Sequence, residues 1–132
     1  MKHATLYMDL ADRISAESKC LRLNVGAVIV KDKNIIAFGW NGMPTGFPNA
    51  CEIDNVTKPE VIHAEANAIL KAARSTESTE GATIFCTHSC CVECAKMIIQ
   101  SGITEFIYRT QYRDHAGLLL LERAGVKVTQ QP

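Results

Sequence analysis

Two short motifs, each placed just before a helix-forming run, constrain this chain more than any other feature. The first is His63-Ala64-Glu65, followed by residues 66–70 (ANAIL), and the second is Cys91-Val92-Glu93-Cys94, followed by residues 95–100 (AKMIIQ). Together they offer one imidazole and two thiols. Structural zinc sites use four protein ligands, whereas catalytic sites use three and leave the fourth position for water. The motifs therefore predict a fold in which two helix starts share a catalytic zinc ion.

The spacing within each motif suggests how its side chains are presented. Cys91 and Cys94 are three residues apart and share one face if Cys91 opens a helix, whose N-terminus favours thiolates. His63 and Glu65 are two residues apart and do not share a face of a regular helix, so we place them on the turn that enters residues 66–70. Glu65 is then free to carry protons to and from a zinc-activated water.

A lone Cys-x-x-Cys motif has other common uses, namely a redox pair or half of a structural zinc site. The His-x-Glu motif upstream of it changes this interpretation, because the combination is a signature of zinc deaminases.

Composition indicates one compact domain that spans residues 1–132, with 47% hydrophobic residues. Fourteen basic and fourteen acidic residues cancel, so the chain lacks the overall positive charge that supports non-specific nucleic-acid binding. A small-molecule substrate is favoured over nucleic acid. The N-terminal residues 1–15 have no apolar signal core, and no run approaches a membrane span. We expect a cytoplasmic protein whose six cysteines are reduced.

Hydrophobic periodicity predicts an α/β fold with a mixed five-stranded sheet, an antiparallel hairpin at one end and helices on both faces. The expected helices are a first helix that ends near Cys20 and residues 64–74, 91–101 and 115–124; the expected strands are residues 25–30, 35–40, 82–86, 105–108 and 126–128. Residues 41–60 are rich in glycine and proline and are expected to form a long loop.

Seven segments resemble the deoxycytidylate (dCMP) deaminases that some bacteriophages encode, within the cytidine deaminase superfamily. They are residues 18–20 (SKC), 25–29 (VGAVI), 39–42 (GWNG), 63–69 (HAEANAI), 81–83 (GAT), 91–95 (CVECA) and 101–103 (SGI). The resemblance implies a three-layer α/β/α cytidine-deaminase-like fold and zinc-dependent hydrolysis of dCMP to dUMP and ammonia, which supplies dUMP for thymidylate synthesis. A phage-encoded enzyme would act in the host cytoplasm.

The resemblance also assigns roles to individual residues. His63, Cys91 and Cys94 would bind Zn²⁺ and Glu65 would be the catalytic acid and base. Ala64 would contact the substrate, Asn41 its sugar, and Arg22, Ser18 and Tyr112 its 5′-phosphate, for which the planar guanidinium of arginine is well suited. Alternatively, Arg22 is a solvated surface cation and Tyr112 a core aromatic.

Many members of the family are homohexamers that dCTP activates and dTTP inhibits, each bound with Mg²⁺. The resemblance makes Lys31, Gly42 and Phe47 candidates for such an effector site. The alternatives are an exposed hairpin tip for Lys31 and loop packing for Phe47.

Two features concern the remaining cysteines. Cys90 stands where the family usually has proline, and it could compete with Cys91 for the metal; we expect it to be a small buried thiol instead. Some family members bind a second, structural zinc through cysteines at positions like Cys20 and Cys51. The loop before His63 is much shorter here, so we expect both to be ordinary buried thiols.

Two rival functions stay open at this stage. The chain could deaminate another substrate, such as cytidine, guanine or a tRNA adenosine, although tRNA enzymes typically carry a basic surface. It could also be a zinc-stabilised binding module without catalysis. Glu65 argues against the second, because a structural metal site needs no proton carrier.

Overall fold

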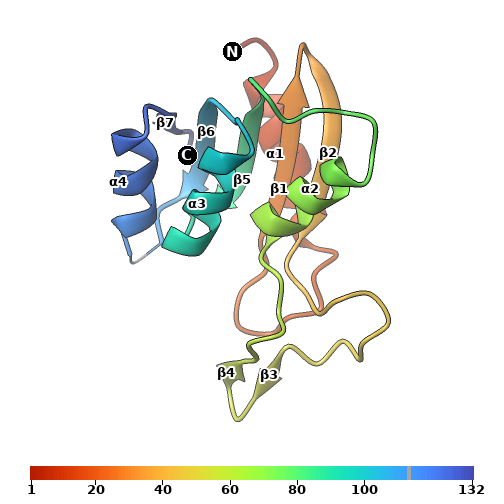
Figure 1. Cartoon of the computed structure of the whole chain (residues 1–132). Coiled ribbons are helices and arrows are strands. Elements are labelled where there is room, and N and C mark those ends of the chain that lie inside the picture. The colour runs from red at the N-terminus through yellow and green to blue at the C-terminus, as the bar shows by residue number, and fades with distance from the viewer. Residues whose placement is uncertain (113) are drawn as a thin grey trace.

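A mixed five-stranded sheet lies at the centre of the computed structural model, which describes residues 1–112 and 114–132 (Figure 1). Its strand order is β2-β1-β5-β6-β7. β1 (Gly26–Lys31) pairs antiparallel with both β2 (Asn34–Trp40) and β5 (Thr83–His88). β6 (Glu105–Thr110) and β7 (Lys127–Gln130) extend the sheet in parallel. The predicted mixed sheet with an antiparallel hairpin at one end is confirmed.

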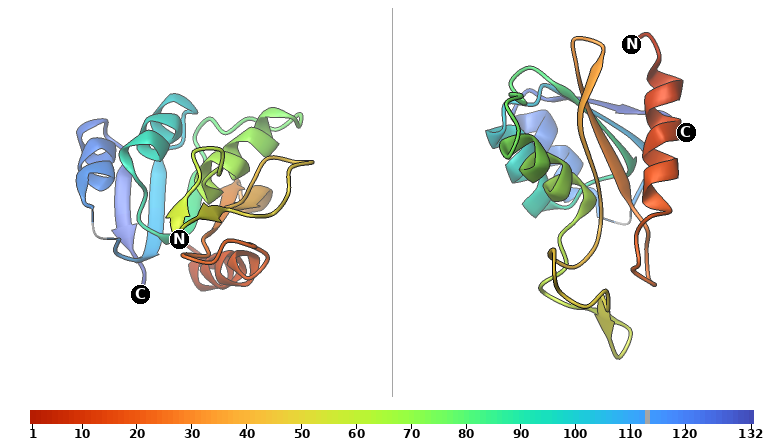
Figure 2. Two further views of the ribbon diagram at one scale, coloured as in Figure 1. Left: turned by 90° about the horizontal axis from the view of Figure 1, so that it is seen from below. Right: turned by 90° about the vertical axis from the view of Figure 1, so that its right-hand side faces the viewer.

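Helices cover both faces of this sheet (Figure 2). α1 (Ala4–Ser15) covers one face, whereas α2 (Ala64–Ala73), α3 (Val92–Gln100) and α4 (Ala116–Arg123) cover the other. A hydrophobic core lies on each face of the sheet, and successive residues of β1 point to opposite faces. Val28 and Val30 pack with α1, whereas Ala27 and Ile29 pack with the helices on the other face. The three-layer α/β/α architecture of the cytidine-deaminase-like fold is therefore present.

The first helix ends earlier than expected. It stops at Ser15 rather than near Cys20, and the backbone N–H groups of Ala16, Glu17 and Ser18 donate to the carbonyls three residues before them. Such bonds tighten the chain into a turn after the last helical residue. The segment after α1 is thereby directed across the end of the sheet.

The long loop predicted for residues 41–60 contains a small hairpin, so that prediction is wrong in part. β3 (Glu52–Ile53) pairs antiparallel with β4 (Val56–Thr57), and Figure 1 shows this hairpin projecting from the main sheet. Its two turn residues, Asp54 and Asn55, have φ values of 51° and 65°. Positive φ at both positions defines a type I′ turn, which aspartate and asparagine tolerate better than most residues.

The expectation that all cysteines are reduced is wrong for one pair. Cys20 and Cys51, separated by 31 positions in the sequence, form a disulfide that joins the segment after α1 to the start of the β3–β4 hairpin. A bonded pair replaces the two free buried thiols that we expected, and it leaves no thiolate at either position for a second zinc. Cys86, Cys90, Cys91 and Cys94 are free.

Within the described part of the chain, no helix has both the length and the apolar character needed to cross a membrane.

Candidate active site

Two helix starts meet at one end of the sheet and bring the three predicted metal ligands together. His63 is the N-cap of α2 and Cys91 is the N-cap of α3. The Nδ1 atom of His63 lies 3.5 Å from Cys91 Sγ and 3.4 Å from Cys94 Sγ. A tetrahedral zinc ion with ordinary bond lengths places its nitrogen and sulfur ligands about 3.6 Å apart. Both nitrogen–sulfur separations therefore fit a tetrahedral zinc ion, and all three ligand atoms lie within 4.8 Å of one another.

Cys90 is separate from this group. Among residues 1–112 and 114–132, only His63, Cys91 and Cys94 form a set of three or more His, Cys, Asp or Glu ligand atoms that lie within 4.8 Å of one another. Cys90 is buried in the core beneath α3, and burial raises the pKa of its thiol. The geometry thus favours Cys91 over Cys90 as a metal ligand.

Of the three ligands, Cys91 is the one whose pKa is shifted toward its metal-binding form. Hydrogen bonds with Cys94 and His63 lower the pKa of Cys91 to about 4, which favours its thiolate at neutral pH. The same contact with Cys91 raises the pKa of His63. The pKa of Cys94 is raised by its hydrogen bond to Cys91 and by burial, so this thiol loses its proton when a metal binds.

Glu65 lies in the first turn of α2 and is only 3% exposed. Burial raises the pKa of its carboxyl group, which brings proton uptake and release closer to neutral pH. A hydrogen bond joins it to the thiol of Cys86, a fully buried residue of β5. Sequence analysis did not identify Cys86, because at a buried strand position a cysteine is usually a core residue.

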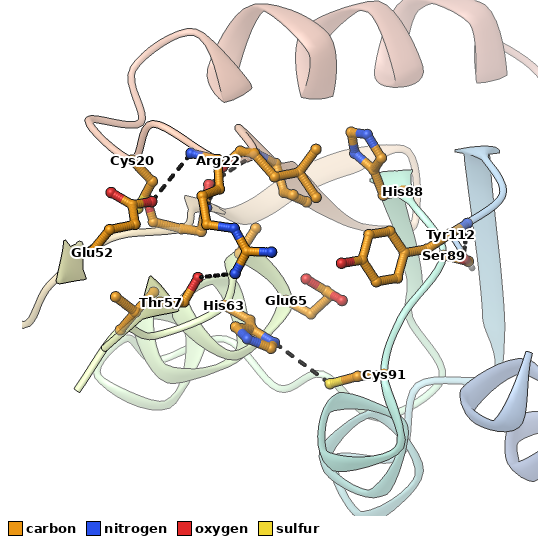
Figure 3. Close-up of a pocket in the computed structure, with 15 residues that line it drawn as sticks. Cys20, Arg22, Glu52, Thr57, His63, Glu65, His88, Ser89, Cys91 and Tyr112 are labelled. Carbon is orange, nitrogen blue, oxygen red and sulfur yellow. Dashed lines mark hydrogen bonds between the residues drawn. The ribbon is translucent and has the colours of Figure 1, made fainter. Parts of the chain in front are cut away.

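A cavity of about 230 Å³ extends from the metal-binding group to the segment after α1 (Figure 3). Of the residues with predicted substrate roles, Arg22, Asn41, Ala64 and Tyr112 line this cavity. The other residues along its wall are Cys20, Leu23, Val25, Glu52, Thr57, Val61, His63, Glu65, His88, Ser89 and Cys91. The cavity therefore connects Glu65 and two of the metal ligands with a guanidinium group.

Ser18 is not among the described residues that line the cavity. Its hydroxyl donates to the Asn41 carbonyl at 2.8 Å and accepts from the Cys20 N–H at 3.3 Å. The Asn41 side chain also binds backbone, because its Oδ1 accepts from the Val25 N–H and its Nδ2 donates to the Leu23 carbonyl, each at 2.8 Å. Both residues stabilise the cavity wall in this structure, and their contacts with substrate stay predictions.

The β3–β4 hairpin contributes two wall residues that sequence analysis missed. The Glu52 carboxylate accepts from the backbone N–H groups of Leu21 at 3.1 Å and Arg22 at 3.2 Å. Arg22 Nη1 donates to Thr57 Oγ1 at 3.4 Å, as Figure 3 shows. Together with the Cys20–Cys51 disulfide, these bonds hold the Arg22 segment against the hairpin. The sequence signal for this hairpin is the Asp54-Asn55 pair between two apolar residues.

The three effector candidates are not brought together within the chain. Lys31 lies at the turn of the β1–β2 hairpin, where its Nζ donates to the Ser78 carbonyl at 3.2 Å. Gly42 follows the opposite end of β2 and pairs with Ile62. Phe47 is exposed in the loop beyond it. Their predicted role stays a prediction.

Comparison with known proteins extends these observations over nearly the whole chain. Residues 1–110 match the family model of the cytidine and deoxycytidylate deaminase zinc-binding region. The chain is 36% identical over 176 aligned residues to the deoxycytidylate deaminase of Enterobacteria phage T4, an alignment that covers 100% of this chain and 91% of the phage protein. It is 40% identical to the ComE operon protein 2 of Bacillus subtilis, covering 94% of this chain and 68% of that protein.

A solved structure supports the same relationship. The crystal structure of the dCMP deaminase from cyanophage S-TIM5, in complex with dCMP and dUMP, superposes with a TM-score of 0.94 at 46% identity and covers 96% of this chain and 95% of that chain. Sequence motifs, fold and site geometry agree with these similarities. The chain belongs to the cytidine and deoxycytidylate deaminase family.

Proposed function

We propose that this protein is a zinc-dependent dCMP deaminase, formed by a single domain over residues 1–132, which converts dCMP and water into dUMP and ammonia. The proposal rests on one observation: the buried Glu65 shares a cavity with Arg22 and with His63 and Cys91, two members of the three-residue ligand group. A proton carrier beside a three-ligand zinc site suits hydrolysis, and a guanidinium in the same cavity suits a phosphate. The phage relatives that align with the whole of this chain are named deoxycytidylate deaminases.

The chemistry follows from these side chains. His63, Cys91 and Cys94 would hold a zinc ion, which would supply an activated water at neutral pH. Glu65 accepts a proton from that water and delivers it to N3 of the cytosine ring, which makes C4 more electrophilic. After the new C4–O bond has formed, Glu65 takes the remaining proton from the C4 hydroxyl and passes it to the amino group. The C4–N bond then breaks, ammonia leaves and the C4–O group becomes the carbonyl of dUMP. Cys86 positions the Glu65 carboxylate during these steps by donating a hydrogen bond from its thiol.

The two ends of the cavity bind different parts of the substrate. Ala64, beside Glu65 at the start of α2, contacts the pyrimidine, and Asn41 contacts the sugar. Arg22 and Tyr112 bind the 5′-phosphate, while Ser18 supports this end of the cavity through Asn41 and Cys20. Because Arg22 is held through its backbone N–H and through Nη1, its guanidinium is already oriented before a nucleotide binds.

Turnover of a substrate panel tests this proposal. Zinc-loaded protein is incubated with dCMP, deoxycytidine, cytidine and guanine, and ammonia release is measured. We expect dCMP to have the highest kcat/KM, and we expect Glu65→Gln to retain zinc while losing nearly all turnover. A Glu65→Gln variant with a tenth of the wild-type rate would contradict the proton-transfer role. Preference for another substrate would contradict the assignment to dCMP.

On the family resemblance, we extend the proposal to a cytoplasmic homohexamer that supplies dUMP for thymidylate synthesis. In this extension, dCTP with Mg²⁺ activates the enzyme and dTTP with Mg²⁺ inhibits it, with Lys31, Gly42 and Phe47 as candidate contacts. Lys31 lies at the opposite end of β2 from Gly42 and Phe47, so a common effector site would need residues from neighbouring subunits. A sigmoidal dependence of rate on dCMP that dCTP makes hyperbolic is expected; hyperbolic kinetics insensitive to both triphosphates would contradict it.

A further inference from the structure

His88 lines the same cavity as Glu65 and Arg22 but has no part in the chemistry described above. It is the last residue of β5 and is partly buried. Figure 3 shows it across the cavity from His63 and Cys91, with the Tyr112 ring between His88 and Cys91. His88 is therefore placed toward the part of a nucleotide that lies farthest from the reacting ring carbon.

The hydrogen bonds of Thr87 determine which nitrogen of His88 carries the proton. Thr87 Oγ1 accepts from the Gly26 N–H at 3.2 Å and lies 2.8 Å from His88 Nδ1. Thr87 is only 3% exposed, so its own hydroxyl hydrogen needs an acceptor within the protein. His88 Nδ1 is in position to be that acceptor. An imidazole that accepts at Nδ1 carries its proton on Nε2.

His88 thus presents an N–H donor on the ring edge that faces away from Thr87. Burial lowers the pKa of His88, which keeps the free ring neutral at pH 7 and preserves this tautomer. The base end of the cavity already holds Glu65 and the metal-binding group, whereas the other end holds the Arg22 guanidinium. A neutral N–H donor and a guanidinium that line one cavity complement two different oxygen atoms of one phosphate group.

We propose that His88 Nε2–H donates a hydrogen bond to the 5′-phosphate of the bound nucleotide, so that His88 and Arg22 together select nucleotides over nucleosides. This inference rests on the proposed function, since it requires a nucleotide whose pyrimidine is held beside Glu65. It assigns His88 to substrate selection and gives Thr87 a positioning role, because the Thr87 hydroxyl fixes the tautomer of the ring.

Substrate preference in His88 variants tests the inference. The ratio of kcat/KM for dCMP to kcat/KM for deoxycytidine is expected to fall about ten- to a hundredfold in His88→Ala, the range of one hydrogen bond to a charged acceptor. His88→Gln is expected to recover part of this ratio, because its amide N–H reaches a position similar to Nε2–H. His115→Ala, at an exposed histidine before α4, is the matched control and should keep the wild-type ratio.

Failure of this inference can be told from failure of the proposed function. If wild-type protein prefers dCMP but His88→Ala keeps the same preference, the phosphate contact is refuted while the proposed function stands. If wild-type protein does not deaminate dCMP, the proposed function itself fails. Long-range ¹H–¹⁵N NMR of histidine-labelled protein gives an independent test: His88 should show the Nε2–H tautomer at pH 7, and an Nδ1–H tautomer would overturn the inference.

Discussion

Gly39 of β2 lies against the backbone of α2, the helix that begins at the metal-binding histidine. A Cβ atom added to Gly39 would lie 2.6 Å from the Ala68 nitrogen and 2.8 Å from the Ala64 carbonyl oxygen. Both neighbours are backbone atoms, so neither can rotate away. Ordinary carbon contacts need about 3.5 Å, and α2 would therefore have to move away from the sheet by about 0.7 Å or more. That movement would carry His63 and Glu65 with it.

We expect Gly39→Ala to lower the free energy of unfolding by about 1 to 3 kcal/mol, the usual cost of an added methyl group in a tightly packed site. Displacement of the catalytic groups by most of an ångström should also lower kcat by ten- to a hundredfold. Urea unfolding, zinc content and dCMP turnover measure these effects. Gly42→Ala is the matched control for stability, because a Cβ there meets no atom within 4 Å. The reasoning would be refuted if Gly39→Ala matched wild-type protein in stability and zinc content.

Three further variants test separate parts of the structure. Arg22→Ala should reduce the kcat/KM preference for dCMP over deoxycytidine by ten- to a hundredfold, and an unchanged preference would remove Arg22 from phosphate binding. Cys86→Ala should lower kcat for dCMP while leaving the zinc content unchanged, because it removes the hydrogen-bond donor to Glu65; wild-type kcat would show that this donor is dispensable. Replacing both Cys20 and Cys51 by serine should lower the free energy of unfolding by about 3 to 4 kcal/mol for a loop that spans 31 positions, as measured by urea unfolding without reductant. Identical unfolding curves for wild-type protein with and without reductant would show that this pair is not bonded in solution.

Local sequence patterns were sufficient to predict most of the sheet and the helices that carry the metal ligands. The turn between β1 and β2 falls at Asp32 and Lys33, between the two strands expected at residues 25–30 and 35–40. The two metal-binding motifs stand at the starts of α2 and α3, as their spacing indicated. These features depend on residues close together in the chain, and helical periodicity and strand alternation report such neighbours directly.

The cavity wall depends on contacts between distant residues, which is why sequence analysis described it less well. Cys20 and Cys51 are paired only because the residues after α1 cross toward the β3–β4 hairpin, and the assumption of reduced thiols concealed that pairing. Glu52 belongs to the cavity wall because it binds the backbone N–H groups of residues 21 and 22, which lie about 30 positions away in the sequence. The Ser18 hydroxyl, assigned by resemblance to the phosphate, is bound to backbone groups in this structure, and its contact with substrate stays a prediction.

X-ray absorption at the zinc edge tests the central claim most directly, because it reports the number and type of atoms bound to the metal in purified protein. The account predicts one zinc ion per chain, with one imidazole nitrogen, two sulfur atoms at about 2.3 Å and one light atom from solvent. Such a shell has a position available for the reacting water. A third sulfur atom, which Cys90 could supply, would close the shell with protein ligands and contradict a catalytic zinc site.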